Sequence, residues 1–193
     1  GAIGVDINAD HLAVTEIDRF GNPVSYLTID LPLYGKSSGQ RKTLIGDAVK
    51  RTVGLALEKG KPIVIENLDF EKKKESLKNG SSWSNSKHNK KYARMLSSFA
   101  YGFIVQDLKA RAFDVGIEVL SVNPAYSSVI GQDKFSDQYK ISRHHSAALV
   151  IARRVLRLSE RLPRQLRVTL PASIEKNGRH VWRLWVDVLQ AER

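Results

Sequence analysis

The sequence contains no cysteine. This absence excludes disulfides, cysteine nucleophiles and thiolate zinc sites, because each needs a cysteine sulfur. It is typical of an intracellular protein, although some secreted proteins also lack cysteine. The chain begins directly with strand-like sequence rather than with a signal peptide. We therefore expect a cytoplasmic protein.

Long apolar runs and acidic residues are also scarce. No run approaches the roughly 20 residues needed to span a bilayer, so no membrane partner is expected. Only 20 Asp and Glu oppose 31 Lys and Arg, which gives the 193 residues a net charge of +11. A basic excess of this size favours a polyanionic partner, most often nucleic acid. A generic basic surface, or attraction to acidic lipid, is the alternative.

The first part of the chain predicts three antiparallel strands, a helix and a fourth strand. The helix, Gln40–Lys59, has an apolar face at three-to-four spacing and is followed by Gly60 as a stop signal. A helix between the third and fourth strands implies a crossover into parallel pairing. The strands are predicted at Ala2–Ile7, His11–Ile17, Val24–Leu31 and Pro62–Glu66.

The second part predicts a helix at Tyr92–Val115, a strand at Ile117–Val122, a loop at Asn123–Ile141 and a helix from Ser142 to about Ser159. Three antiparallel strands followed by two strands that helical crossovers reach describe the ribonuclease H-like fold. The predicted class is therefore α/β, with a five-stranded mixed sheet flanked by helices, over residues 1–160.

Residues 161–193 are predicted to form a basic C-terminal extension containing a β-hairpin. The strands would be Leu166–Ile174 and Arg179–Leu189, joined by a tight turn at Asn177-Gly178. One face of the second strand would carry Trp182, Leu184, Val186 and Val188.

Residues 67–91 lack periodicity and are rich in lysine, so they predict a basic loop inserted after Glu66. Such a loop can contact phosphates, and Trp83 within it can stack on an unpaired base. A merely solvated insertion is the alternative. The basic residues expected to bind nucleic acid are Lys72, Lys73, Lys74, Lys87, Lys90 and Lys91, together with Arg153 and Arg154 further along the chain.

Two acids, Asp6 and Glu66, stand at the ends of buried strands. In the predicted fold these strands are neighbours, so the carboxylates repel each other unless a cation lies between them. Hard oxygen ligands suit Mg²⁺ or Mn²⁺, which can activate water against a phosphodiester. The alternative is that Asp6 caps a turn and Glu66 pairs with a lysine.

His144 lies on the apolar stripe of the helix that begins at Ser142, with Ala147, Ala148 and Ile151. In its first turn it is either a satisfied residue at the edge of the core or a group that reaches the strand ends. The residues alone favour the first interpretation. His145 points elsewhere on the helix and is a poorer candidate.

Three segments together resemble the RuvC-type nuclease core of TnpB proteins, which are transposon-encoded relatives of the type V CRISPR effectors. These segments are Gly4-Val5-Asp6, Ile63-Val64-Ile65-Glu66-Asn67-Leu68 and Ala147-Ala148-Leu149-Val150-Ile151-Ala152-Arg153-Arg154. The stretch Val122-Asn123-Pro124-Ala125-Tyr126-Ser127-Ser128 is similar to another segment of that family. The resemblance implies a metal-dependent DNA nuclease associated with the nucleoid, RNA-guided in full-length members, with Asp6 and Glu66 as catalytic ligands.

The sequence departs from that family at two points. His144 stands where the family has its third aspartate, and the four-cysteine zinc ribbon is absent. The resemblance therefore leaves two possibilities: an Asp6–Glu66–His144 site, in which His144 is the third ligand or the general base, or a nucleic-acid-binding module that has lost cleavage. Asp133 and Asp137 are alternative acids in the preceding loop.

Overall fold

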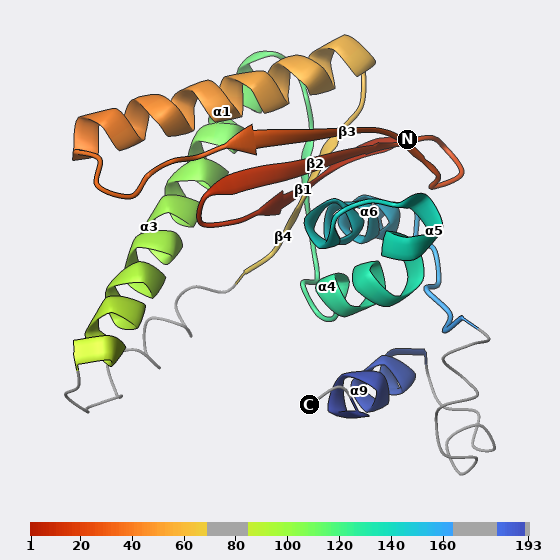
Figure 1. Cartoon of the computed structure of the whole chain (residues 1–193). Helices are drawn as coiled ribbons and strands as arrows, with labels where there is room; N and C mark the ends of the chain where they lie inside the picture. Colours follow the sequence, from red (N-terminus) through yellow and green to blue (C-terminus); the bar gives the residue numbers. More distant parts are fainter. Residues whose placement is uncertain (69–84, 164–180, 192–193) are drawn as a thin grey trace.

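The computed structural model describes residues 1–68, 85–163 and 181–191, with the backbone alone for 85–99 and 191. A five-stranded mixed sheet lies at its centre, in the order β3-β2-β1-β4-β5 (Figure 1). β1, β2 and β3 pair antiparallel, whereas β4 pairs parallel with both β1 and β5. The ribonuclease H-like prediction is confirmed. The strands are β1 (Ala2–Ile7), β2 (His11–Ile17), β3 (Pro23–Asp30), β4 (Ile63–Glu66) and β5 (Val119–Val122).

Two long helices cover one face of the sheet. α1 (Ser38–Lys59) begins with a capping box at Ser37 and ends at Gly60, whose φ of 59° only glycine adopts readily. α3 (Asn85–Asp114) packs beside α1 on this face (Figure 1). The core between the layers joins Ile3, Val5, Ile63 and Ile65 of the sheet to Val49, Ile104 and Leu108 of the helices.

α6 (Arg143–Val155) covers the opposite face, where it packs on β1 and β2. The approach is closest at Gly4, where a Cβ atom would lie 2.0 Å from the carbonyl oxygen of Ala148. Ala152 is also close, at 2.9 Å. Glycine in the strand and alanines in the helix thus let the two backbones meet. Leu149 and Ile151 fill the surrounding core.

The predicted loop at Asn123–Ile141 is wrong, because much of it is helical. It forms α4 (Ser127–Ile130), the π-helical η1 (Gly131–Ser136) and α5 (Asp137–Tyr139). Ile130 and Phe135 are buried against α6. The segment has too few turns for a helical period to emerge from its sequence, and its burial stabilises the turns.

The predicted strand over Arg179–Leu189 is also wrong, since α9 (Val181–Ala191) occupies this stretch. Its sequence satisfies both periods: alternate residues are apolar, and so are Val181, Leu184, Trp185 and Val188 at helical spacing. Trp185 is 1% exposed and packs in the α6 core, so tertiary packing selects the helix. The other proposed strand, Leu166–Ile174, and the turn at Asn177-Gly178 lie outside the described residues.

The basic loop predicted at 67–91 is wrong at its C-terminal end. α3 begins at Asn85, so Lys87, Lys90 and Lys91 belong to a helix. Lys72, Lys73, Lys74 and Trp83 lie outside the described residues. Within residues 1–68, 85–163 and 181–191, no helix has the length and apolar character needed to cross a membrane.

Substituting Gly4 tests the close contact between β1 and α6. Gly4→Ala should lower the free energy of unfolding by about 3 kcal/mol, because the new methyl group overlaps the Ala148 carbonyl. Gly54→Ala is the matched control: it is exposed in α1, nothing lies within 4 Å of its Cβ position, and helix propensity should raise stability by up to about 1 kcal/mol. Urea denaturation measures both; equal effects would contradict the packing.

Candidate active site at the ends of β1 and β4

Asp6 and Glu66 each come directly after one of two residues that pair across the neighbouring parallel strands β1 and β4. β1 pairs with β4 through Gly4↔Val64 and Val5↔Ile65, so the register places Asp6 beside Glu66. Gly4 contacts α6 and Val64 belongs to the α6 core, whereas Val5 and Ile65 face the α1 side. Because side chains alternate along a strand, both carboxylates lie on the α6 side of the sheet.

α6 brings His144 to Asp6. The Nδ1 atom of His144 lies 3.1 Å from Oδ2 of Asp6, and Asn8 Nδ2 donates to the same oxygen at 3.0 Å. Positions 144, 148 and 152 share one helix face, so the face that packs on Gly4 also carries the histidine. The Asp6 side chain is 16% exposed and that of His144 35%, which leaves the pair accessible from solvent.

His11 and Asp10 join this cluster, and the sequence prediction missed both. The His11 and His144 rings meet edge to face, with centroids 4.7 Å apart, and His11 Nδ1 lies 2.7 Å from Asp10 Oδ1. This hydrogen bond holds the pKa of the Asp10 carboxyl below its usual value. The hairpin register Asp6↔Ala13 places His11, two residues before Ala13, on the same face, so strand counting could have found it.

His145 takes a different position, as the helix geometry predicts. Its ring contacts Thr28 Oγ1 at 3.2 Å and Ser142 Oγ at 3.0 Å, on the β3 side of α6. Burial lowers the pKa of His145. The Ser142 hydroxyl also accepts the backbone N–H of His145, which caps the first turn of α6 and fixes the residues that carry both histidines.

Glu66 is held by two hydroxyl groups from helices. Ser127, at the start of α4, donates to the Glu66 carboxylate, and Tyr101 of α3 donates to the Glu66 carbonyl oxygen at 2.6 Å. Burial and the negative charges of Glu66 and Asp6 raise the pKa of Tyr101 well above its usual range. The sequence prediction did not identify Ser127 or Tyr101.

The alternative acids Asp133 and Asp137, and the predicted phosphate-binding Arg153, have surroundings that differ from those of the Asp6–His144 cluster. Asp133 lies in η1, and Asp137 lies in α5, where its exposed carboxylate is 4.0 Å from Lys140. Arg153 is used internally: it pairs with Glu160 at 2.5 Å and donates to the Gly21 carbonyl oxygen at 2.6 Å.

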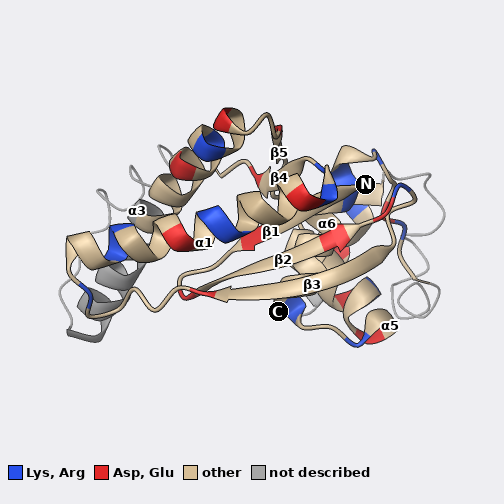
Figure 2. Cartoon of the chain, turned by 90° about the horizontal axis from the view of Figure 1, so that it is seen from above, with Lys and Arg blue, Asp and Glu red and all other residues tan. Residues whose placement is uncertain are grey.

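Arg154 is half-buried, and its guanidinium donates to the Ala125 carbonyl oxygen. Burial lowers the pKa of Arg154, while the Glu66 charge opposes this shift. Arg154 thus carries a positive charge that the Glu66 carboxylate attracts. The charges on α1 are arranged differently, because basic and acidic residues are interspersed along that helix (Figure 2).

The donor set fits a hard divalent cation that keeps part of its own water shell. Among the residues whose side chains the structure describes, no three His, Asp or Glu gather closely enough to form a complete ligand set. Mg²⁺, however, commonly binds through one or two carboxylates, with waters and substrate phosphates as its other ligands. Asp6 and Glu66 supply two carboxylates, and both polar contacts seen for the Asp6 side chain are on Oδ2.

Comparison with known proteins identifies the fold. No protein-family model matches the chain, and no curated protein matches it. The structure of Thermus thermophilus RuvC in complex with a Holliday junction substrate is similar with a TM-score of 0.50 and 12% identity, over 78% of this chain and 88% of RuvC. A second T. thermophilus RuvC structure gives a TM-score of 0.47 at the same identity, over 78% of this chain and 90% of that one. The likeness at a TM-score of 0.50 agrees with the ribonuclease H-like fold seen in the sheet order.

Removing the cap of α6 should loosen the histidine cluster. Ser142→Ala should lower the free energy of unfolding by about 1 kcal/mol, because the His145 N–H loses its acceptor. It should also shift the ring NMR resonances of His144 and His145. Ser37→Ala removes the equivalent cap of α1 and is the matched control: a similar loss of stability with unchanged ring resonances is expected. Unchanged resonances in Ser142→Ala would contradict this role.

Proposed function

We propose that the chain is the core of a divalent-metal-dependent DNA endonuclease that hydrolyses phosphodiester bonds. The observation that carries this proposal is the placement of Asp6 and Glu66 side by side, on the face that α6 covers, at the ends of β1 and β4. The RuvC-like fold supports it, because the similar RuvC structure holds a Holliday junction. Such an enzyme would act in the cytoplasm, at the nucleoid.

Each residue of the site would have a role that follows from its chemistry. Asp6 and Glu66 would hold Mg²⁺ or Mn²⁺, which when bound polarises a phosphate and lowers the pKa of water. Ser127 and Tyr101 would orient Glu66 through their hydrogen bonds. His144 would complete the ligand set or take a proton from the attacking water, and its contact with Asp6 puts it within reach of either role.

Within this class of nucleases, we propose more specifically that the chain is a TnpB-like protein. This proposal rests on the sequence segments around Asp6, Glu66 and Ala147–Arg154, which resemble that family. A guide RNA would then be a second partner beside DNA. The basic residues of the 67–91 region, with Arg154, are proposed to bind backbone phosphates without reading sequence.

A nucleic-acid-binding module without cleavage is the second candidate. The observation that favours it concerns His144, the proposed third ligand. Among the described side chains no three-residue ligand group forms, and the Nδ1 atom of His144 contacts Asp6. Histidine is also a weaker ligand than carboxylate for Mg²⁺. Such a module would bind DNA in a salt-dependent way.

Cleavage of labelled single- and double-stranded DNA with Mg²⁺ or Mn²⁺ tests the enzyme proposal. Asp6→Asn and Glu66→Gln should each reduce the cleavage rate by more than about 100-fold, because metal-bound charge stabilisation contributes several kcal/mol to such reactions. Glu58→Gln, an exposed acid near the end of α1, is the control and should cleave normally. Activity that survives both site substitutions would refute the assignment.

Substitutions at His144 separate the two candidates. If the site is active as it stands, His144→Ala should lower cleavage by about 10- to 100-fold or more, as expected for a ligand or general base. If cleavage has been lost, the wild type should bind DNA without cutting it, and His144→Asp should introduce metal-dependent cleavage. Equal cleavage by the wild type and His144→Ala would exclude a catalytic role for this histidine.

A further inference from the structure

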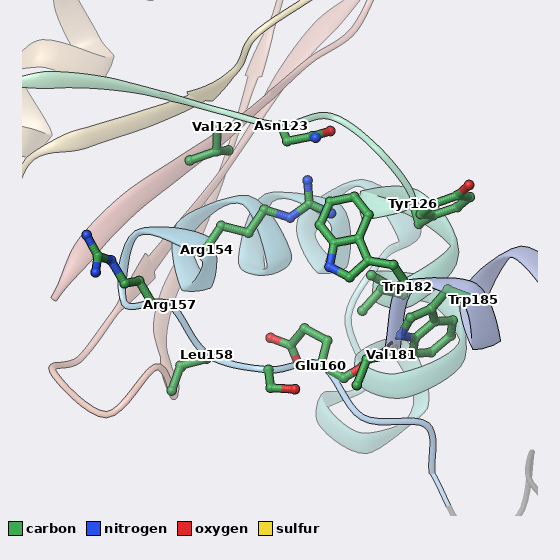
Figure 3. Close-up of a pocket in the computed structure, with 12 residues that line it drawn as sticks. Val122, Asn123, Tyr126, Arg154, Arg157, Leu158, Glu160, Val181, Trp182 and Trp185 are labelled. Atoms are coloured by element: carbon green, nitrogen blue, oxygen red, sulfur yellow. Dashed lines mark hydrogen bonds between the residues drawn. The ribbon is translucent and has the colours of Figure 1, made fainter. Parts of the chain in front are cut away.

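A cavity of about 430 Å³ lies between α9, the end of α6 and the segment that follows β5 (Figure 3). Its volume falls within the roughly 300–1,000 Å³ typical of pockets that enclose small ligands. The residues that matter in its lining are Tyr126, Arg154, Arg157, Glu160, Trp182 and Trp185.

Trp182 presents an aromatic ring to the cavity. The residue is 39% exposed, and its ring meets that of Tyr126 edge to face, with centroids 6.1 Å apart. Trp185 has a different role, because it is 1% exposed and its indole N–H donates to the Glu160 carbonyl oxygen at 2.7 Å. Trp185 thus anchors α9, and Trp182 is the ring on which a ligand can stack.

The charge of the lining is positive. The Arg154 guanidinium lies 5.5 Å from the centroid of the Trp182 ring, and its Nη1 atom is buried with no hydrogen-bond partner among the described residues. Arg157 adds a second cation. Glu160 is the one acid in the described lining, and its carboxylate already pairs with Arg153 and Lys134. This lining suits a ligand that combines an anion with a flat aromatic ring.

The cavity is joined to Glu66 through two adjacent residues. Tyr126 lines the cavity, and the next residue, Ser127, donates to the Glu66 carboxylate. Tyr126 also has a φ of 63°, a conformation that is costly for a bulky side chain and concentrates at functional sites. A ligand against Tyr126 and Trp182 would therefore lie next to the segment that holds Glu66.

We propose that this cavity receives one unpaired nucleotide of the DNA on which the Asp6–Glu66 site acts. The base would stack on Trp182 beside Tyr126, and its phosphate would lie on the side of Arg154 and Arg157. This inference rests on the proposed function, because it requires that the chain binds DNA. It adds a preference for DNA in which at least one base has left the helix.

Binding of two fluorescently labelled duplexes tests the proposal: one fully paired, and one identical except for a single unpaired adenine. The measurement is made in EDTA, so that cleavage does not interfere. The wild type should bind the duplex with the unpaired base about 5- to 100-fold more tightly, which is the range for stacking one base on an aromatic side chain. Trp182→Leu should abolish this preference and leave the affinity for the paired duplex unchanged. Phe113→Leu, an exposed aromatic on α3, is the matched control and should keep it.

The possible outcomes distinguish failure of the nucleotide pocket from failure of the proposed nuclease function. Binding of both duplexes with equal affinity by the wild type, or an unchanged preference in Trp182→Leu, would overturn the nucleotide pocket and leave the nuclease proposal standing. No binding to either duplex in EDTA would overturn the nucleotide pocket, and the cleavage assay with metal decides the nuclease proposal separately. Free 5′-AMP provides the remaining arm: Trp182-dependent binding of AMP without any preference between the duplexes would mean that the cavity takes free nucleotides, which contradicts the proposal.

Discussion

The contact between α6 and β1 governs both the packing of the protein and the geometry of its candidate site. Gly4 lets the backbone of α6 approach at Ala148 and Ala152. One turn nearer the start of the same helix, His144 reaches the Asp6 carboxylate. A larger side chain at position 4 would separate helix and strand, and the histidine would move with the helix. The close packing of small residues is therefore what holds an imidazole within hydrogen-bonding distance of a strand-end acid.

Much of the sheet follows from the sequence because its signals are local and agree with one another. The apolar β1, the alternating β3 and the helix ended by Gly60 each predict one element, and helical crossovers have few permitted topologies. The same logic predicts that Asp6 and Glu66 meet, since strand order alone makes them neighbours. These parts of the fold need no knowledge of distant contacts.

Other features could not be predicted because tertiary contacts decide them. The sequence of α9 fits a strand as well as a helix, and burial of Trp185 in the α6 core selects the helix. Helices as short as α4 and α5 give no periodic signal and depend on the burial of Ile130 and Phe135. The contacts of Glu66 with Ser127 and Tyr101 join residues distant in sequence. His11 is the exception, because the hairpin register places it on the correct face.

The anchoring of α9 by Trp185 also bears on where this protein can be divided. A boundary at 160 would remove a large buried ring and Val188 from the core that contains Leu149 and Ile151. It would also leave the Glu160 carbonyl without the indole that donates to it. The shortened chain would expose apolar surface on the side of α6 that faces away from the sheet, and exposed apolar surfaces promote aggregation. We therefore expect a stable form of this domain to include the C-terminal helix, whatever the activity of its site.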